Sequence, residues 1–182
     1  MTPTELLRGE HRIIERVLAV LQRAADRLEK GEQVDPAIFE QAIDFIRNFA
    51  DRYHHAKEEE GLFTTMQVHG VPRNGGPIGV MLMEHEEGRA HVRGMAEALE
   101  DYPVGNGVAS DALTRHARGY ADLLQAHIYK EDNILYPIGE RVLSAKAQQG
   151  LMEEFQTLER RVLSPQDRQR YLEMVERLEK AL

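Results

Sequence analysis

The sequence predicts an all-α fold, an antiparallel up-down four-helix bundle made of two repeated helical hairpins and followed by C-terminal helices. Strand signals are scarce, because β-branched residues seldom alternate with polar ones. Apolar residues and histidines instead recur with alternating steps of four and three, the period of a buried helix face. Helix start signals also recur: a capping residue directly precedes a proline at Thr2-Pro3, Asp35-Pro36 and Ser164-Pro165.

These signals divide the chain into six helices. The first begins at Thr2, with Glu5 in the capping-box position, and Gly31 ends it. Gly70 ends the second helix in the same way. Two segments rich in glycine and proline, 70–77 and 102–109, are the expected loops. We expect long helices near 3–30, 36–68, 78–101 and 110–143, and shorter ones near 145–161 and 165–181.

Composition excludes several classes of function. At 182 residues and 42% hydrophobic content the chain can build one cored domain. It has no cysteine, which excludes disulfides, zinc fingers, thiolate-bound clusters and thiol nucleophiles. A net charge of −8 argues against nucleic acid and anionic membrane as partners. Neither a membrane-spanning apolar run nor a secretory signal is visible, so we expect a cytoplasmic protein.

Two stretches of the sequence match at an offset of 73 residues. Residues 54–63 read HHAKEEEGLF and residues 127–136 read HIYKEDNILY, so His, Lys, Glu and Leu fall in register before an aromatic residue. Upstream, the pairs Glu10-His11 and Glu84-His85 match at an offset of 74. The first four helices are therefore predicted to be two copies of one hairpin, each with a histidine followed by a His-x-x-x-Glu motif.

Helix geometry predicts that four histidines lie at one level. At 1.5 Å per residue, His11 and His54 both lie roughly 27 Å from the loop that joins their helices. His85 and His127 both lie roughly 24 Å from the loop of the second hairpin. In antiparallel hairpins these four side chains can meet in one layer of the bundle.

Two glutamates, Glu58 and Glu131, share the faces of His54 and His127 and have apolar helical neighbours. A buried carboxylate without a partner costs several kcal/mol. Two such groups beside four imidazoles are explained if they coordinate cations. Mixed sets of histidine and carboxylate in a helical bundle are typical of non-haem di-iron centres.

At these residues the sequence resembles the hemerythrin-like family, whose repeated unit is the His-His-Glu cation-binding motif. The family pattern often ends in Leu-Phe-Pro; Leu62-Phe63-Thr64 and Leu135-Tyr136-Pro137 match it, the first without the proline. The resemblance covers about residues 1–160, which we expect to form the cation-binding domain, with 161–182 as a C-terminal helical extension.

The resemblance implies two non-haem iron ions. Each hairpin would supply two histidines to one iron, and the two glutamates would bridge the ions. His55 is expected as a fifth histidine ligand, because related domains place a ligand at that position. Manganese or zinc would also suit these donors. The expected metal ligands are His11, His54, His55, Glu58, His85, His127 and Glu131.

The sequence departs from the oxygen-carrying hemerythrins at two places. They have a second histidine four residues after that of the third helix, where this chain has Arg89. They also end with His-x-x-x-x-Asp, whereas this chain has His127-x-x-x-Glu131. Both departures argue against reversible oxygen carriage of the usual kind.

Three functions remain open. The first is a binding protein whose partner is a small diatomic ligand or peroxide, or one that senses or stores iron. The second is a di-iron enzyme that decomposes peroxide or reduces nitric oxide; no general acid or base away from the metals is visible to support it. The third is an iron-responsive regulatory module acting through the C-terminal helices, which are also the expected contact of a homodimer.

Overall fold

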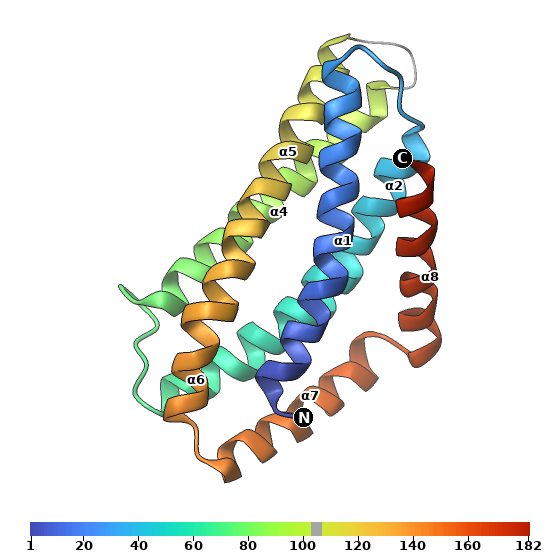
Figure 1. The fold of residues 1–182 in the computed structure, drawn as a ribbon. Coiled ribbons are helices and arrows are strands. Elements are labelled where there is room, and N and C mark those ends of the chain that lie inside the picture. Colours follow the sequence, from blue (N-terminus) through green and yellow to red (C-terminus); the bar gives the residue numbers. More distant parts are fainter. Residues whose placement is uncertain (103–106) are drawn as a thin grey trace.

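The computed structural model describes residues 1–102 and 107–182, and all regular structure in them is helical (Figure 1). This confirms the all-α class. Four long helical segments lie side by side, and two further helices, α7 and α8, follow. The elements are α1 (Pro3–Glu29), α2 (Pro36–Phe45), η1 (Ile46–His55), η2 (Lys57–Leu62), α3 (Phe63–Val68), α4 (Pro77–Asp101), α5 (Gly107–Lys130), η4 (Glu131–Leu135), α6 (Tyr136–Val142), α7 (Ala145–Val162) and α8 (Pro165–Ala181).

Local sequence explains where the helices begin and end. The Thr2 side chain accepts from the backbone N–H of Glu5, and the Glu5 side chain accepts in return from the backbone N–H of Thr2. Gly31 and Gly70 follow the first and second long segments at φ of 76° and 92°, a conformation that glycine adopts without strain. The predicted boundaries therefore agree with the structure to within a few residues.

The predicted loop 102–109 is wrong at its end. Gly107 begins α5, whereas we expected the helix to start near residue 110. A glycine is tolerated there because the first backbone N–H groups of a helix need no intrahelical partner. The rest of that loop, 103–106, lies outside the described residues.

Part of the second and fourth segments is π-helical, with hydrogen bonds from residue i to i+5. The segments η1 and η2 interrupt the helix between α2 and α3, and η4 interrupts the one between α5 and α6. Such turns are often found at functional sites, because they widen the helix and change the direction of side chains. They contain four of the predicted ligands, His54, His55, Glu58 and Glu131.

The apolar core consists of two clusters. The larger one joins α1, α2 and α5 and takes in four residues of α8, from Tyr171 to Leu178. The smaller one joins the start of α1 to α3, η4 and α6 and takes in Leu151 and Phe155 of α7. In Figure 1, α7 crosses one end of the molecule and α8 runs back along α1 and α2. The helices after residue 144 thus complete both clusters.

No helix in the described part of the chain combines the length and the apolar character that crossing a membrane requires.

Candidate metal centre

A buried polar layer separates the two apolar clusters. It contains all seven predicted ligands, and each of them is at most 5% exposed. On α1, for example, Leu7 belongs to the smaller cluster and Ile14 to the larger, and His11 lies between them. We refer to these seven side chains as the polar layer: His11, His54, His55, Glu58, His85, His127 and Glu131.

Within the polar layer, the side chains form two groups whose ligand atoms lie within 4.8 Å of one another. Glu58 belongs to both groups, which places its carboxylate between them. Glu131 Oε2 lies 3.2 Å from Nε2 of His11 and 3.3 Å from Nε2 of His127, so it also contacts both sides. One group is His11, His54, Glu58 and Glu131, and the other is His55, Glu58, His85 and His127.

Each histidine of the polar layer contacts a carboxylate through Nδ1, which leaves Nε2 for the layer itself. The Nδ1 atom of His11 lies 2.8 Å from Asp132, and that of His85 lies 2.7 Å from Glu59. Such contacts fix the tautomer and ring orientation of histidines that bind metals. The remaining Nδ1 contacts are His54–Glu10 at 2.9 Å, His127–Glu84 at 2.9 Å and His55–Asp51 at 3.4 Å.

These contacts follow the internal repeat of the sequence. Glu59 and Asp132 occupy matching positions at the offset of 73, and each contacts the first histidine of the other hairpin. Glu10 and Glu84 match at 74, and each contacts the second histidine of its own hairpin. The repeat therefore extends from the expected ligands to the groups that orient them.

Two lysines also occupy matching positions and pair with these outer carboxylates. Lys57 donates to Glu10 and Lys130 donates to Glu84. Lys57 is fully buried and also donates to Glu159 of α7 at 2.8 Å, so α7 takes part in the network on one side only. Burial raises the pKa of Glu10 to about 7, although Lys57 opposes the shift.

His55 and Tyr136 make the two halves of the site unequal. The position that matches His55 in the second hairpin is Ile128, and the His55 ring stacks on His85 with centroids 3.8 Å apart. The Tyr136 hydroxyl donates to Glu58 at 2.5 Å and lies 3.2 Å from Nε2 of His11, whereas the matching residue is Phe63.

The two central carboxylates carry opposite pKa shifts. Burial and the negative charge of Glu131 raise the pKa of Glu58 well above its ordinary value. Burial also opposes ionisation of Glu131, but His127 and His11 outweigh it and hold its pKa well below the ordinary value. Like-charge carboxylates this close share protons unless cations offset their charge.

The donor atoms of the polar layer fit divalent cations. Oε2 of Glu58 and both carboxylate oxygens of Glu131 are buried and accept no well-directed hydrogen bond from the described residues. Buried oxygens without such partners are costly, and a metal ion between them and the Nε2 atoms would satisfy them. Imidazole nitrogen with carboxylate oxygen suits iron, manganese and zinc.

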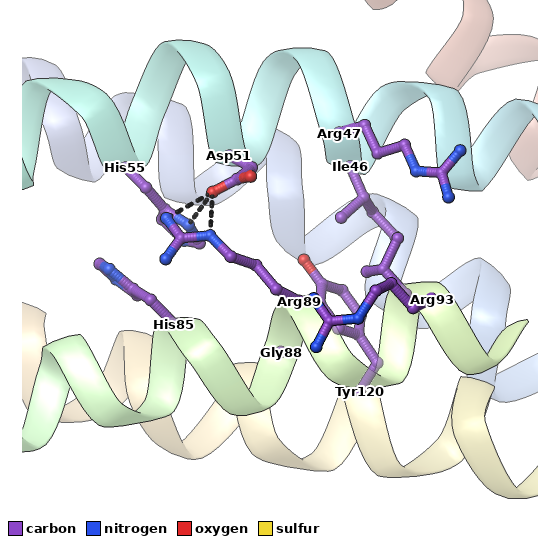
Figure 2. Close-up of a pocket in the computed structure, with 10 residues that line it drawn as sticks. Ile46, Arg47, Asp51, His55, His85, Gly88, Arg89, Arg93 and Tyr120 are labelled. Carbon is purple, nitrogen blue, oxygen red and sulfur yellow. Dashed lines mark hydrogen bonds and ion pairs between the residues drawn. The ribbon is translucent and has the colours of Figure 1, made fainter. Parts of the chain in front are cut away.

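A cavity of about 200 Å³ opens beside the polar layer (Figure 2). Its lining includes the edges of His55 and His85 and the buried ring of Tyr120. Arg89, the residue at which the sequence departs from the oxygen carriers, lies at this cavity and bonds to Asp51 at 2.9 Å and Glu59 at 2.8 Å. Solutes therefore have a lateral approach to His55 and His85.

Sequence reasoning placed the seven inner side chains but missed most of the outer ones. The sequence patterns do not distinguish Glu59, Asp132, Glu10 or Asp51 from solvated surface acids. Glu84 and Arg89 also contact the site, Glu84 through His127 and Arg89 through Glu59. The offset of 73 was the signal that could have identified Glu59 and Asp132, and the offset of 74 relates Glu10 to Glu84.

Comparison with known proteins places the chain in a family. The family model described as hemerythrin HHE cation binding domain matches residues 2–138. Similar curated proteins are the uncharacterized proteins Rv1995 of Mycobacterium tuberculosis (strain ATCC 25618 / H37Rv) and Mb2018 of Mycobacterium bovis. Each is 24% identical over 180 residues, which is 99% of this chain and 69% of the relative. With this match over most of its length, the chain belongs to the hemerythrin HHE cation-binding family.

Proposed function

We propose that the chain is a hemerythrin-type protein that binds two non-haem iron ions in the polar layer. The observation that carries this proposal is the set of buried carboxylate oxygens, Oε2 of Glu58 and both of Glu131, that accept no well-directed hydrogen bond from the described residues and are enclosed by five imidazoles whose Nδ1 atoms are already engaged. The fold that we propose to hold these ions is an up-down four-helix bundle of two repeated hairpins. Residues 1–160 would form the cation-binding domain and 161–182 its C-terminal extension.

The chain's own residues would hold the ions in two unequal sets. His11 and His54 lie in one group and His55, His85 and His127 in the other, so each ion would have at least two imidazole nitrogens. Glu58 is common to both groups, which favours a bridging role, and Glu131 contacts both sides. When bound, iron supplies a redox-active Lewis acid for a small ligand.

The proposed ligand is a small diatomic molecule or peroxide. The cavity lined by His55 and His85 offers a route of suitable size to the polar layer. Nearby groups hold these rings in place, because Asp51 and Glu59 engage their Nδ1 atoms and Arg89 ties the two carboxylates together. We also propose a cytoplasmic location and no nucleic-acid partner; the net charge of −8 supports the second point.

The first test is anaerobic reconstitution with ferrous iron and a count of iron per chain. We expect two ions in the wild type and fewer in His54→Ala and Glu131→Ala. His69→Ala serves as the control, because His69 lies at the exposed end of α3 and its ring contacts only the backbone oxygen of Thr65 among the described residues. Two ions retained in both layer variants would contradict the proposed ligands.

A di-iron enzyme is the second candidate, and Tyr136 favours it. Its buried hydroxyl donates to Glu58 and could deliver a proton to a ligand in the layer. Optical spectra of the iron-loaded protein, recorded on adding oxygen, nitric oxide or peroxide, separate the candidates. Reversible changes favour binding, whereas turnover of peroxide or nitric oxide that falls at least tenfold in Tyr136→Phe favours the enzyme.

A regulatory role or a homodimer through the C-terminal helices would have to use their outer faces. The apolar residues of α8 from Tyr171 to Leu178 already pack on the same chain. Light scattering with and without iron tests both: a change of mass on loading supports regulation, and a constant dimer mass supports a fixed homodimer.

A further inference from the structure

Two histidines outside the polar layer face each other across the contact between α4 and α5. His91 of α4 and His116 of α5 bring their Nδ1 atoms to 3.3 Å from each other. The ring centroids lie 5.5 Å apart with 65° between the ring planes, and both side chains are partly exposed. The hairpin repeat accounts for His85 and His127 on these two helices. It does not account for His91 and His116.

A glycine on the facing helix makes room for each ring. A Cβ added to Gly119 would lie 2.4 Å from the His91 ring, and one added to Gly94 would lie 2.4 Å from the His116 ring. Each imidazole therefore lies directly against the backbone of the opposite helix. This reciprocal packing restricts both rings to the orientation in which the Nδ1 atoms converge.

The distance between the nitrogens suits coordination of one ion. A tetrahedral zinc ion with Zn–N bonds of about 2.05 Å would separate two of its donors by about 3.3 Å. A hydrogen bond between two imidazoles would need one ring to carry a proton on Nδ1, whereas a metal uses the lone pairs of both. Imidazole is a preferred ligand of zinc, nickel and copper.

The surroundings of the pair keep an imidazole neutral and available. Burial lowers the pKa of His116, and the adjacent His91 and Arg115 lower it further, while Glu97 acts in the opposite direction. A neutral imidazole is the form that binds metal.

We propose that His91 and His116 form a second divalent-cation site, a two-imidazole clamp for zinc or a similar late transition metal at the surface of α4 and α5. Water completes the coordination, so the ion exchanges readily. The clamp links the two helices and stabilises the folded chain by an amount that rises with the logarithm of metal concentration above the dissociation constant. It is independent of the polar layer, and neither site is needed for the other to exist.

Zinc ions alone are the first probe, titrated into the full chain in equilibrium dialysis. We expect His91→Asn and His116→Asn each to bind one zinc ion fewer than the wild type, or to bind it at least tenfold more weakly. His69→Asn is the matched control and should keep the full number. Circular dichroism checks that each variant is folded, and His54→Ala should lose zinc from the layer while keeping the clamp.

A further measurement keeps both histidines of the clamp. Gly119→Ala should displace the His91 ring and weaken the same zinc ion at least tenfold, with both histidines still present. Unchanged zinc binding in both asparagine variants, or in Gly119→Ala, would overturn the proposal.

Discussion

The Nδ1 atoms of five buried histidines each contact a carboxylate, and these contacts decide which nitrogen of each ring faces the polar layer. An imidazole held in this way does not have to reorganise when an ion binds, and its basicity is raised by the charge behind it. The outer carboxylates are consequently as much a part of the site as the side chains in the layer.

Glu59→Gln should weaken metal binding by about 10–100-fold, because the amide keeps a contact to His85 but loses the charge behind the ring. The neighbouring variant Glu60→Gln is the control, since Glu60 is exposed and pairs with Arg161 on the surface. Chelator competition monitored by iron content measures both. Equal affinities in the two variants would contradict an orienting role for Glu59.

The inner residues could be predicted from sequence because histidine spaced four residues before glutamate, repeated at 73 residues, is rare by chance. Their partners are ordinary acidic residues on helices, which are solvated in most proteins. Only the three-dimensional pairing of the two hairpins shows that Asp132 lies behind His11 and Glu59 behind His85. The pair of His91 and His116 was missed for the same reason: its members are 25 residues apart and follow no motif.

The C-terminal helices are attached to the rest of the chain by apolar contacts and by ion pairs. Phe155 of α7 packs over Gly61 of η2, and α8 is joined to α1 by Arg16 and Glu179. The sequence predicts both helices, near 145–161 and 165–181, but not which surface of the chain covers their apolar residues. It likewise missed the π-helical turns, because an i+5 hydrogen bond leaves little trace in the spacing of side chains.

Gly61→Ala should destabilise the fold by about 1–3 kcal/mol, because the new methyl group would overpack a closed contact. Its Cβ would lie 2.8 Å from the ring of Phe155 and 3.0 Å from Leu151. Gly150→Ala, in the same pair of packed elements, is the control: nothing lies within 4 Å, so the helix should gain about 0.5–1 kcal/mol. Urea unfolding of the two variants should give shifts of opposite sign.

The contact between α1 and α8 should depend on pH. Hydrogen bonding to Arg16 lowers the pKa of Glu179 below its value in the unfolded chain. The stabilisation is therefore present above the unfolded pKa and is lost as the pH falls through the lower folded pKa. Because both side chains are partly exposed, the effect is about 0.2–1 kcal/mol.

Urea unfolding of the wild type and of Glu179→Gln, at pH 7 and at pH 3, measures the contribution of this contact to the free energy of unfolding. The two proteins should differ at pH 7 and converge at the lower pH. Glu173→Gln, which removes an exposed acid of α8 bonded to Gln169, should behave like the wild type at both values. A difference that grows on acidification would contradict this assignment.

At the scale of the whole molecule, the chain holds a polar layer between two apolar clusters that would otherwise merge into one core. Without a cation, Glu58 avoids repulsion from Glu131 by keeping a proton, because its pKa is raised well above the ordinary value, and a bound cation would take the place of that proton. Folding and metal binding are consequently linked.

Ferrous iron should raise the melting temperature of the wild type, with a stabilisation of about 2.7 kcal/mol at 100 times the dissociation constant. Glu58→Gln should lose most of this increase while its metal-free form is at least as stable as the wild type, because the neutral amide replaces a carboxyl that is itself neutral beside Glu131 when no metal is bound. Differential scanning calorimetry under nitrogen, with and without iron, gives both values. A metal-free variant much less stable than the wild type would show that Glu58 contributes to folding without an ion.

The charges around the cavity beside His55 and His85 affect which solutes reach the polar layer. Arg47, Arg89 and Arg93 line it; Arg89 pairs with Asp51, Glu59 and Glu86, whereas no ion pair within the described residues engages Arg47 or Arg93, so these two guanidinium groups give the mouth a local positive charge. Positive charge at the mouth lowers the local concentration of free cations and raises that of small anions, whereas it does not affect the entry of an uncharged gas. The cavity mouth would therefore select solutes by charge and would admit a neutral or negative solute more readily than the metal ion itself.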